Sequence, residues 1–202
     1  MKTFWMTLLL AYAPLVVADN SALDSDLMQK CGSCHGIDGN SPLPIVPNLA
    51  GQLSGYLLYE LQAYKKHDRV DKFMGTIIDP IPDDDIAKLA LFYSKQKLNN
   101  TTPRIIFDPA LIAKGRLLYT TEIEKVGLSC ADCHGDHAEG VVNPKEIKDF
   151  PRLAGQRYDY LMFNLQEYAD RMKDHSLLGM RAVAATLTND TIKALAAFLS
   201  SL

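Results

Sequence analysis

The pattern Cys-x-x-Cys-His occurs twice in this chain of 202 residues, first as Cys31, Cys34 and His35 and again as Cys130, Cys133 and His134. Two thiols three positions apart can both reach the vinyl groups on one edge of a porphyrin, and the next histidine can place its imidazole on the iron. The pattern is typical of covalent c-type haem attachment. Because all four cysteines of the chain belong to these two copies, the sequence predicts two covalently bound c-type haems (iron).

Two other uses of paired cysteines fit the sequence less well. A structural zinc site brings together two ligand pairs that are commonly ~12 to 20 residues apart, whereas 95 residues separate Cys34 from Cys130. A thioredoxin-like redox site places one Cys-x-x-Cys in an alternation of strands and helices, and the sequence has no such alternation. The cysteines therefore favour haem.

Residues 1–18 have the features of a secretory signal peptide. Lys2 supplies a positive charge, residues 4–17 are apolar apart from Thr7, and residues 16–18 are small enough for cleavage. The apolar run of 14 residues is shorter than the ~20 that a spanning helix needs, although an uncleaved anchor stays open. Because c-type haem is attached outside the cytoplasm, we expect a protein exported to the periplasm.

The charge of the remaining chain argues against a nucleic-acid partner. Without residues 1–18 the chain keeps 20 basic and all 24 acidic residues, and 20 minus 24 gives a formal charge of −4. It has no basic stripe and no interleaving of basic and aromatic residues. Its 184 residues suit one large domain or two small ones.

The two halves of the chain repeat one sequence pattern, and this repeat favours two small domains over one large domain. The segment Pro-Asn-Leu-Ala-Gly-Gln at 47–52 recurs as Pro-Arg-Leu-Ala-Gly-Gln at 151–156, and Tyr-Leu-x-x-x-Leu-Gln-x-Tyr at 56–64 recurs at 160–168. The offset rises from 99 at the first cysteines to 104 in these segments and 106 near the chain end, so insertions fall between the matched segments. Such self-similarity indicates a duplicated domain.

We expect domain 1 to cover residues 19–102 and domain 2 residues 103–202, because the polar segment 99–103 ends in proline and is typical of a linker. Apolar spacing and capping signals predict that both halves are helical. The predicted helices cover residues 56–66, begin at the acidic turn 83–85, run from Asp108 or Pro109 through Tyr119, and begin at Thr188 or Asn189.

The repeat also selects ligands for the sixth position of each iron. Met74 lies 12 residues before Ile86, and Met180 lies 12 residues before Ile192, so the two match at an offset of 106. Histidine–methionine ligation raises the reduction potential and suits electron transfer. We therefore predict Met74 and Met180, each in the loop before a final helix, as the ligands opposite the two proximal histidines. Methionines without a counterpart are expected to fill the core; these are Met28, Met162 and Met172.

Three histidines remain outside the predicted ligand set. His67 and His175 stand in charged stretches and are expected at the surface. His137 follows the proximal His134 by three residues, and from a loop at the haem edge it would be able to tune the potential or its response to pH.

Taken in order, these motifs resemble the dihaem cytochrome c4 family from about residue 27 to residue 199. The resemblance implies an all-α fold of two tandem class I cytochrome c domains, each wrapped around one covalently bound haem and packed face to face. It also implies that the carbonyl groups of Pro47 and Pro151 accept hydrogen bonds from the proximal imidazoles. Both prolines would shape a turn in any case.

Two features depart from a simple doubling. The segment before the first haem, 19–30, is shorter than its counterpart 108–129, which predicts an abbreviated N-terminal helix and a more exposed first haem. Residues 141–149 form an insertion that carries Lys145, Glu146 and Lys148. This insertion is either a docking loop for a partner or a solvated surface loop.

The resemblance implies a periplasmic electron carrier and not an enzyme. Its expected partners are redox proteins: a membrane-bound quinol-oxidising complex as donor, and a terminal oxidase or other reductase as acceptor, with loose membrane association left open. Two alternatives stay open. One is a tightly bound dihaem subunit of an oxidoreductase such as a flavocytochrome sulfide dehydrogenase. The other is a dihaem peroxidase, which would leave one iron accessible to peroxide.

Overall fold

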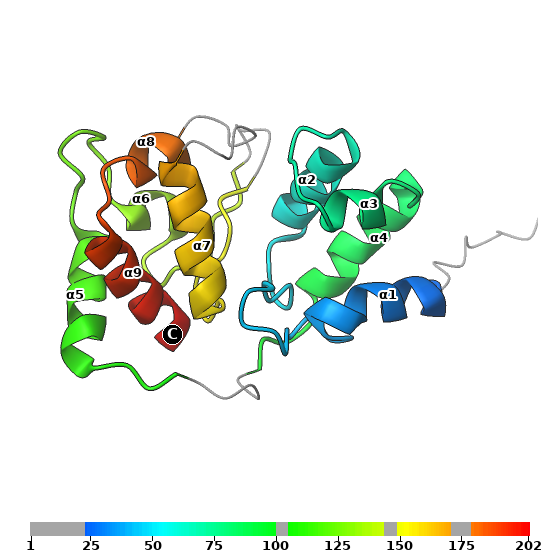
Figure 1. Ribbon diagram of the computed structural model, residues 1–202, viewed down its shortest axis with the longest axis horizontal. Coiled ribbons are helices and arrows are strands. Elements are labelled where there is room, and N and C mark those ends of the chain that lie inside the picture. The colour runs from blue at the N-terminus through cyan, green and yellow to red at the C-terminus, as the bar shows by residue number, and fades with distance from the viewer. Residues whose placement is uncertain (1–22, 100–104, 144–148, 171–178) are drawn as a thin grey trace, which may run out of the picture.

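The computed structural model describes residues 23–99, 105–143, 149–170 and 179–202 (Figure 1). The predicted signal peptide, most of the linker, Met172 and His175 lie outside these ranges, as do Lys145, Glu146 and Lys148 of the insertion. Within them the regular structure is helical, and the β-type pairs are two isolated antiparallel bridges, Ile123–Leu128 and Val141–Phe150. The all-α class predicted from the sequence is confirmed. No helix in the described ranges has both the length and the apolar character to span a membrane.

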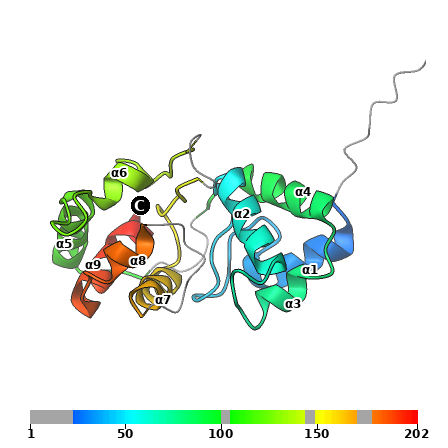
Figure 2. The same cartoon turned by 90° about the horizontal axis from the view of Figure 1, so that it is seen from above.

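The helices form two groups, one from each half of the chain (Figures 1 and 2). Domain 1 contains α1 (Ser25–His35), α2 (Ser54–Lys65), α3 (Met74–Ile78) and α4 (Asp83–Ser94). Domain 2 contains α5 (Pro109–Thr120), α6 (Cys130–His134), α7 (Tyr158–Ala169), α8 (Met180–Ala184) and α9 (Asn189–Ser201).

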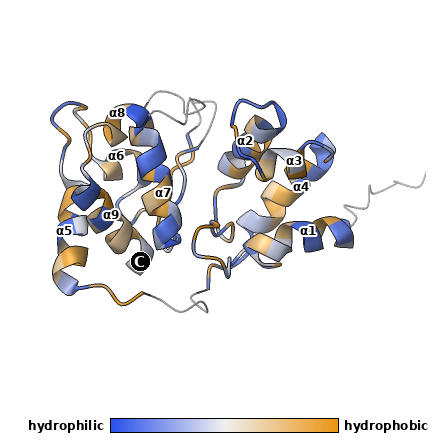
Figure 3. Cartoon of the chain, viewed as in Figure 1, coloured by the Kyte–Doolittle hydropathy of each residue, from blue (hydrophilic) through white to orange (hydrophobic). Residues whose placement is uncertain are grey.

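The core of domain 1 forms where α2 packs against α4. The apolar stripe of α4 is buried, with Ile86 at 0% and Leu89 at 1% exposure, while α1 shows both hydrophilic and hydrophobic colours (Figure 3) and packs Leu27 against this core. The predicted acidic turn is the first turn of α4, where carboxylates complement the positive end of the helix dipole. There Asp83 also forms a 2.8 Å ion pair with Lys65 at the end of α2, which ties the two helices together.

The core of domain 2 is built on the crossing of α5 and α9. Asp108 caps α5 by accepting a hydrogen bond from the Ala110 N–H, and of the two caps expected for α9 the structure has Thr188. The helices approach closely at Gly115, where a Cβ would overlap the carbonyl oxygen of Ala194. A glycine is therefore required at this crossing.

The two domains differ in the segment before Cys-x-x-Cys-His. In domain 1 this motif forms the end of α1, whereas in domain 2 residues 121–129 separate α5 from the short helix α6. The length difference seen in the sequence therefore appears as one continuous helix in domain 1 and two separate helices in domain 2.

Candidate haem-binding sites

The first site is built on the last turns of α1. Residues three apart in a helix lie on one face, so Cys31 and Cys34 share a face of α1. His35 is only 7% exposed, while Cys34 is exposed to solvent. Gly36 ends the helix with φ +80°, a conformation that favours glycine. The turn of chain that follows brings residues 47–52 back towards the histidine.

The second site repeats this arrangement on α6. A capping box holds the short helix: the Ser129 hydroxyl accepts a hydrogen bond from the Asp132 N–H, and the Asp132 carboxylate accepts one from the Ser129 N–H at 2.7 Å. This box places Cys130 and Cys133 on one face. His134 is 5% exposed, so both predicted proximal histidines are buried at the end of a helix.

Each of these histidines donates a hydrogen bond to a proline carbonyl. The distance from Nδ1 of His35 to the oxygen of Pro47 is 3.0 Å, and that from Nδ1 of His134 to the oxygen of Pro151 is 2.9 Å. A proton held on Nδ1 leaves Nε2 as the nitrogen that can bind a metal. Burial lowers the pKa of His35, although the bond to Pro47 opposes this shift. The neutral imidazole is therefore favoured, and this is the form that ligates iron.

Three of the four cysteines, Cys31, Cys130 and Cys133, are partly buried. All four are free of disulfide bonds. Burial raises the pKa of Cys31, and it raises the pKa of Cys130 to about 11 and that of Cys133 in the same direction. A catalytic or redox-active cysteine needs a lowered pKa so that the thiolate forms. These environments argue against such roles and agree with covalent attachment of a prosthetic group.

A tyrosine beside each site distinguishes the two domains. Within the described ranges, the Tyr93 hydroxyl is the buried side-chain polar group without a hydrogen-bond partner, and burial together with the nearby Cys31 raises its pKa. In domain 2 the Tyr119 hydroxyl instead donates to the carbonyl oxygen of Gly135 at 2.6 Å. An unpaired buried hydroxyl costs about 1 to 3 kcal/mol. The residues around Cys31 therefore fit a bound group that offers an acceptor.

The two predicted methionine ligands occupy equivalent positions, although not in loops. Met74 is the first residue of α3 and Met180 is the first residue of α8, and both are half-buried. The segments expected as loops are short helices. The sequence did not predict these helices, because five residues carry too little periodic pattern to be recognised. The unpaired Met28 and Met162 pack against the cores of their own domains, as expected for fillers.

Two of the remaining histidines are exposed, and the third lies outside the described residues. The His67 side chain is 70% exposed, and its Nε2 lies 3.7 Å from a carboxylate oxygen of Asp79. His137 is exposed, and its N–H donates to the Glu139 carboxylate at 2.9 Å. His175 lies outside the described residues. In the described ranges, no three His, Cys, Asp or Glu side chains form a group that could hold a bare metal ion.

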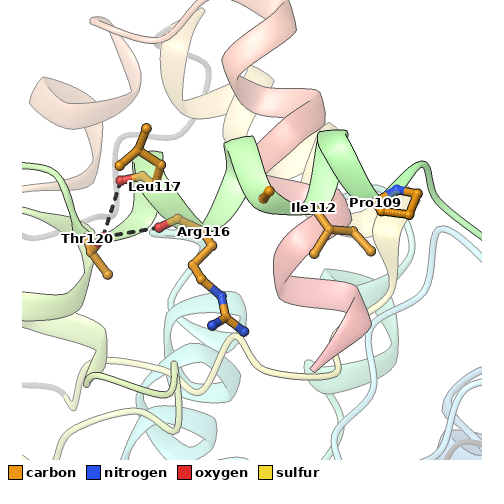
Figure 4. A pocket seen from close by; sticks show the side chains of 6 residues that line it. Pro109, Ile112, Arg116, Leu117 and Thr120 are labelled. Atoms are coloured by element: carbon orange, nitrogen blue, oxygen red, sulfur yellow. Dashed lines mark hydrogen bonds between the residues drawn. The ribbon is translucent and has the colours of Figure 1, made fainter.

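A surface depression of about 550 Å³ lies along the outer face of α5 and is separate from the two sites (Figure 4). It is lined by Pro109, Ile112, Ala113, Arg116, Leu117 and Thr120. These residues belong to a single helix, and Leu117 is 67% exposed. The lining includes no carboxylate, histidine or cysteine, so the depression offers no acid, base or thiol nucleophile.

The segments that follow the two prolines meet at the interface between the domains. The Gln156 side chain bonds the backbone of Asn48, and the Gln52 side chain bonds the backbone of Arg152. All four residues lie in the repeated segments, one position or five positions after Pro47 or Pro151. Sequence reasoning recognised these glutamines only as part of the repeat; their recurrence in both halves was the signal of a shared role.

Two helical domains, each with a Cys-x-x-Cys-His helix and a buried histidine bonded to a proline carbonyl, define a c-type cytochrome with two haem domains. The family model for cytochrome c matches residues 25–96 and 112–202. Cytochrome c4 from Stutzerimonas stutzeri is 34% identical over 184 residues, which cover 85% of this chain and 84% of that protein. The chain belongs to the cytochrome c4 family. It is a dihaem electron-transfer cytochrome with two covalently bound c-type haems.

Solved structures agree with this assignment. The cytochrome c4 structure from Acidithiobacillus ferrooxidans matches with a TM-score of 0.72 and 31% identity, over 86% of this chain and 99% of that chain. A thiosulfate dehydrogenase from Marichromatium purpuratum matches with a TM-score of 0.68 and 28% identity. That match covers 85% of this chain but only 36% of the dehydrogenase chain, so a similar unit also occurs within a longer chain.

Proposed function

We propose that this protein is a periplasmic electron carrier that accepts electrons from a membrane-bound quinol-oxidising complex and passes them to a terminal oxidase or another reductase. The observation that carries the proposal is the repeated geometry of the two sites, in which each buried histidine donates from Nδ1 to a proline carbonyl at 3.0 Å or 2.9 Å. Two equivalent sites suit the holding of two electrons, and neither site includes an acid–base pair or an activated nucleophile.

In domain 1, residues 19–102, we assign His35 and Met74 as the axial ligands. Cys31 and Cys34 would form the thioether bonds. When bound, the haem supplies reversible one-electron chemistry at its iron. The contribution of the chain is to hold the ligands, because the bond from His35 to the Pro47 carbonyl fixes the imidazole plane and raises the basicity of the ligand.

In domain 2, residues 103–202, the matching ligands are His134 and Met180. Cys130 and Cys133 would form the thioether bonds, and the Pro151 carbonyl would orient the imidazole. With these histidines and methionines as ligands, neither iron would have a coordination position open to substrate. This closure favours outer-sphere electron transfer over the dihaem peroxidase alternative, which needs an open position.

Residues 1–18 would direct export and be removed. Attachment of c-type haem outside the cytoplasm supports this location. Expression in a bacterium with the haem-attachment machinery, followed by osmotic release, tests it. The mature protein should begin at Asp19 and appear in the periplasmic fraction with two haems; a membrane-bound product that retains residue 1 would instead support the anchor alternative.

The carrier function is tested by mixing the reduced holoprotein with membranes that contain a terminal oxidase. We expect both haems to be oxidised in step with oxygen consumption, and an inhibitor of the oxidase should abolish both. Failure to transfer electrons to any oxidase of the native membranes, combined with fast exchange with one soluble dehydrogenase, would contradict the proposed acceptor.

A second function is that of a bound haem subunit of an oxidoreductase. The observation that favours it is the match to 36% of a thiosulfate dehydrogenase chain, which places a similar unit inside an enzyme. Purification from the native source separates the two functions. A stable complex of one-to-one composition with a dehydrogenase, including a flavoprotein sulfide dehydrogenase, would replace the free-carrier proposal.

A further inference from the structure

Two glutamines cross the interface between the domains in opposite directions. Oε1 of Gln156 accepts a hydrogen bond from the Asn48 N–H at 2.8 Å, and its Nε2 donates to the Asn48 carbonyl oxygen at 3.0 Å. Oε1 of Gln52 likewise accepts from the Arg152 N–H at 2.8 Å, and its Nε2 donates to the Arg152 carbonyl oxygen at 2.9 Å. The two pairs are related by the internal repeat, because each matches the other at an offset of 104.

The orientation of both amides is determined by their surroundings. Oε1 of Gln156 also accepts a bond from the Arg157 N–H at 2.8 Å, and Oε1 of Gln52 accepts one from the Leu53 N–H at 3.0 Å. Each oxygen therefore faces two N–H donors, and each Nε2 faces a carbonyl. Rotating either amide by half a turn would set donors against donors, so the assignment of oxygen and nitrogen is secure.

One of the two peptide groups that each glutamine binds across the interface, the one that donates to Oε1, also holds a proximal histidine. The carbonyl of Pro47 and the N–H of Asn48 belong to one peptide unit; the carbonyl accepts from His35, and the N–H donates to Gln156. In domain 2 the unit between Pro151 and Arg152 accepts from His134 and donates to Gln52. Each proximal histidine is thus one peptide group away from a side chain of the other domain.

We propose that Gln52 and Gln156 are positioning residues that tune the reduction potential of the haem in the opposite domain. The proposal rests on the proposed role of the two histidines as axial ligands. Both glutamines are buried, at 7% and 8% exposure, and so is Asn48, at 9%. Because water is excluded from these bonds, their polarising effect is not screened.

The direction of the effect follows from the polarity of the peptide group. A bond accepted from the peptide N–H shifts electron density towards the carbonyl oxygen and strengthens the bond that this oxygen accepts, by about 10–30%. A stronger bond from Nδ1 makes the imidazole a more basic ligand, which favours the oxidised iron. Gln156 therefore lowers the potential of the haem in domain 1, and Gln52 lowers that of the haem in domain 2.

The coupling acts in both directions. If contact across the interface favours the oxidised form of a haem, then oxidation of that haem must strengthen the contact by the same free energy. The amides of Asn48 and Arg152 are consequently expected to exchange with solvent more slowly in the oxidised protein than in the reduced protein. Through these two peptide groups, each domain would sense the redox state of the other.

The test uses the dihaem holoprotein and the variants Gln52→Met and Gln156→Met, which keep the length of the side chain and remove its polar atoms. Gln156→Met should shift the ratio of oxidised to reduced haem in domain 1 about two- to fivefold towards the reduced form, or ~18 to ~41 mV at 59 mV per tenfold change. Gln52→Met should do the same in domain 2. NMR of the oxidised protein identifies each haem by the resonances that Met74→Ala or Met180→Ala removes.

Gln96→Met is a matched control, because Gln96 bonds the Phe92 carbonyl within domain 1 and touches neither of the two peptide groups. It should leave both potentials unchanged. A crossed pattern, in which each glutamine variant shifts the potential of the haem in the opposite domain only, supports the proposal. Equal shifts of both haems in each variant would show only a loosened interface and would overturn it, as would shifts confined to the haem of the mutated domain.

A second variant keeps the test decisive if the methionine variants do not fold. Gln156→Glu retains an oxygen that accepts from the Asn48 N–H, so the potential of domain 1 should stay at or below that of the wild type; a rise would contradict the proposal. Failure of the axial-ligand assignment would be recognised separately, because the wild-type spectrum would then lack histidine–methionine ligation. With that spectrum intact and no crossed shift, only the inference about the glutamines fails.

Discussion

Met74 and Met180 each begin a five-residue helix that directly precedes the last helix of its domain. Both lie 12 residues before a buried isoleucine of that last helix, Ile86 or Ile192, which are 0% and 1% exposed. The structural equivalence extends the match seen in the repeat. It supports the assignment of the same role to both methionines.

Replacing either methionine should affect one haem only. We expect Met74→Ala and Met180→Ala each to lower one reduction potential, because loss of the thioether removes the ligand that favours reduced iron. The expected shift is about a hundredfold in the equilibrium constant, or ~120 mV at 59 mV per tenfold change. A spectroscopic redox titration measures both potentials in one experiment.

Met28→Ala and Met162→Ala are the controls, because both side chains pack against the cores without a counterpart in the repeat. Each should lower the free energy of unfolding by about 2 kcal/mol and leave the absorption spectra of both haems unchanged. If Met172→Ala lowered a potential and Met180→Ala did not, the register of the repeat would be the wrong guide to the ligand.

Domain 1 contains a buried ion pair between Arg69 and Glu60. Arg69 donates to the Glu60 carboxylate at 2.6 Å, and the two side chains are only 11% and 6% exposed. Removing one partner of a buried pair leaves an uncompensated charge and typically costs about 3 to 5 kcal/mol. We expect this loss in the free energy of unfolding of Arg69→Met, as measured by urea denaturation.

The exposed pair of Lys88 and Asp85 provides a comparison, with side chains 44% and 31% exposed. Lys88→Met should change stability by less than about 1 kcal/mol. The double variant Glu60→Leu with Arg69→Met should be more stable than Arg69→Met alone. A double variant that loses the sum of the two single effects would contradict the description of a coupled buried pair.

The crossing of α5 and α9 should not tolerate a larger residue at Gly115. A Cβ there would overlap the Ala194 carbonyl oxygen and lie 2.7 Å from Cβ of Phe198. We expect Gly115→Ala to destabilise domain 2 by about 1 to 3 kcal/mol, as overpacking does elsewhere. Leu117→Ala removes an exposed side chain from the same helix and should change stability by less than about 0.5 kcal/mol beyond helix propensity. Equal effects would argue against close packing at the glycine.

Acid should weaken the hydrogen bond that joins Asn99, near the end of domain 1, to the carboxylate of Asp38. Burial alone would raise the pKa of Asp38, but hydrogen bonds from the backbone and side chain of Asn40 and from the side chain of Asn99 hold it below the ordinary 3.8. A lowered pKa in the folded state means that this carboxylate stabilises the fold above about pH 3.8 and that the contribution is lost as the pH falls below it.

The difference in unfolding free energy between wild type and Asp38→Asn should therefore shrink between pH 5 and pH 3. Urea denaturation at several pH values measures this difference. A difference that stays constant over that range would show that the hydrogen bonds from Asn40 and Asn99 do not depend on the charge of Asp38.

Motifs with local chemistry were the part of the fold that the sequence could predict. Thr188 or Asn189 is expected to cap the last helix, because a polar side chain before an apolar stripe satisfies the first free N–H groups of a helix, and in the structure the cap is Thr188. The sequence also predicts that a helix begins at Asp108 or Pro109, and in the structure Asp108 is its cap. The number of domains could also be predicted, because an internal repeat can be recognised in the sequence without knowing how the chain packs.

Contacts between distant residues could not be predicted in this way. Gln52 and Gln156 bond residues about 100 positions away, and such bonds depend on how two finished domains dock. Glu60 and Arg69 were unremarkable in the sequence because charged residues usually lie at the surface. The short helices α3 and α8 were expected as loops, since their start is set by tertiary packing and not by pattern.

The most direct test of the central claim is a spectroscopic redox titration of the purified mature holoprotein, combined with its mass. The proposed carrier should have the mass of the chain plus two haems, two one-electron transitions, and, when oxidised, the methionine-to-iron band near the red edge of the spectrum from both haems. A single haem, or a high-spin haem without that band, would contradict the proposal of two closed histidine–methionine sites.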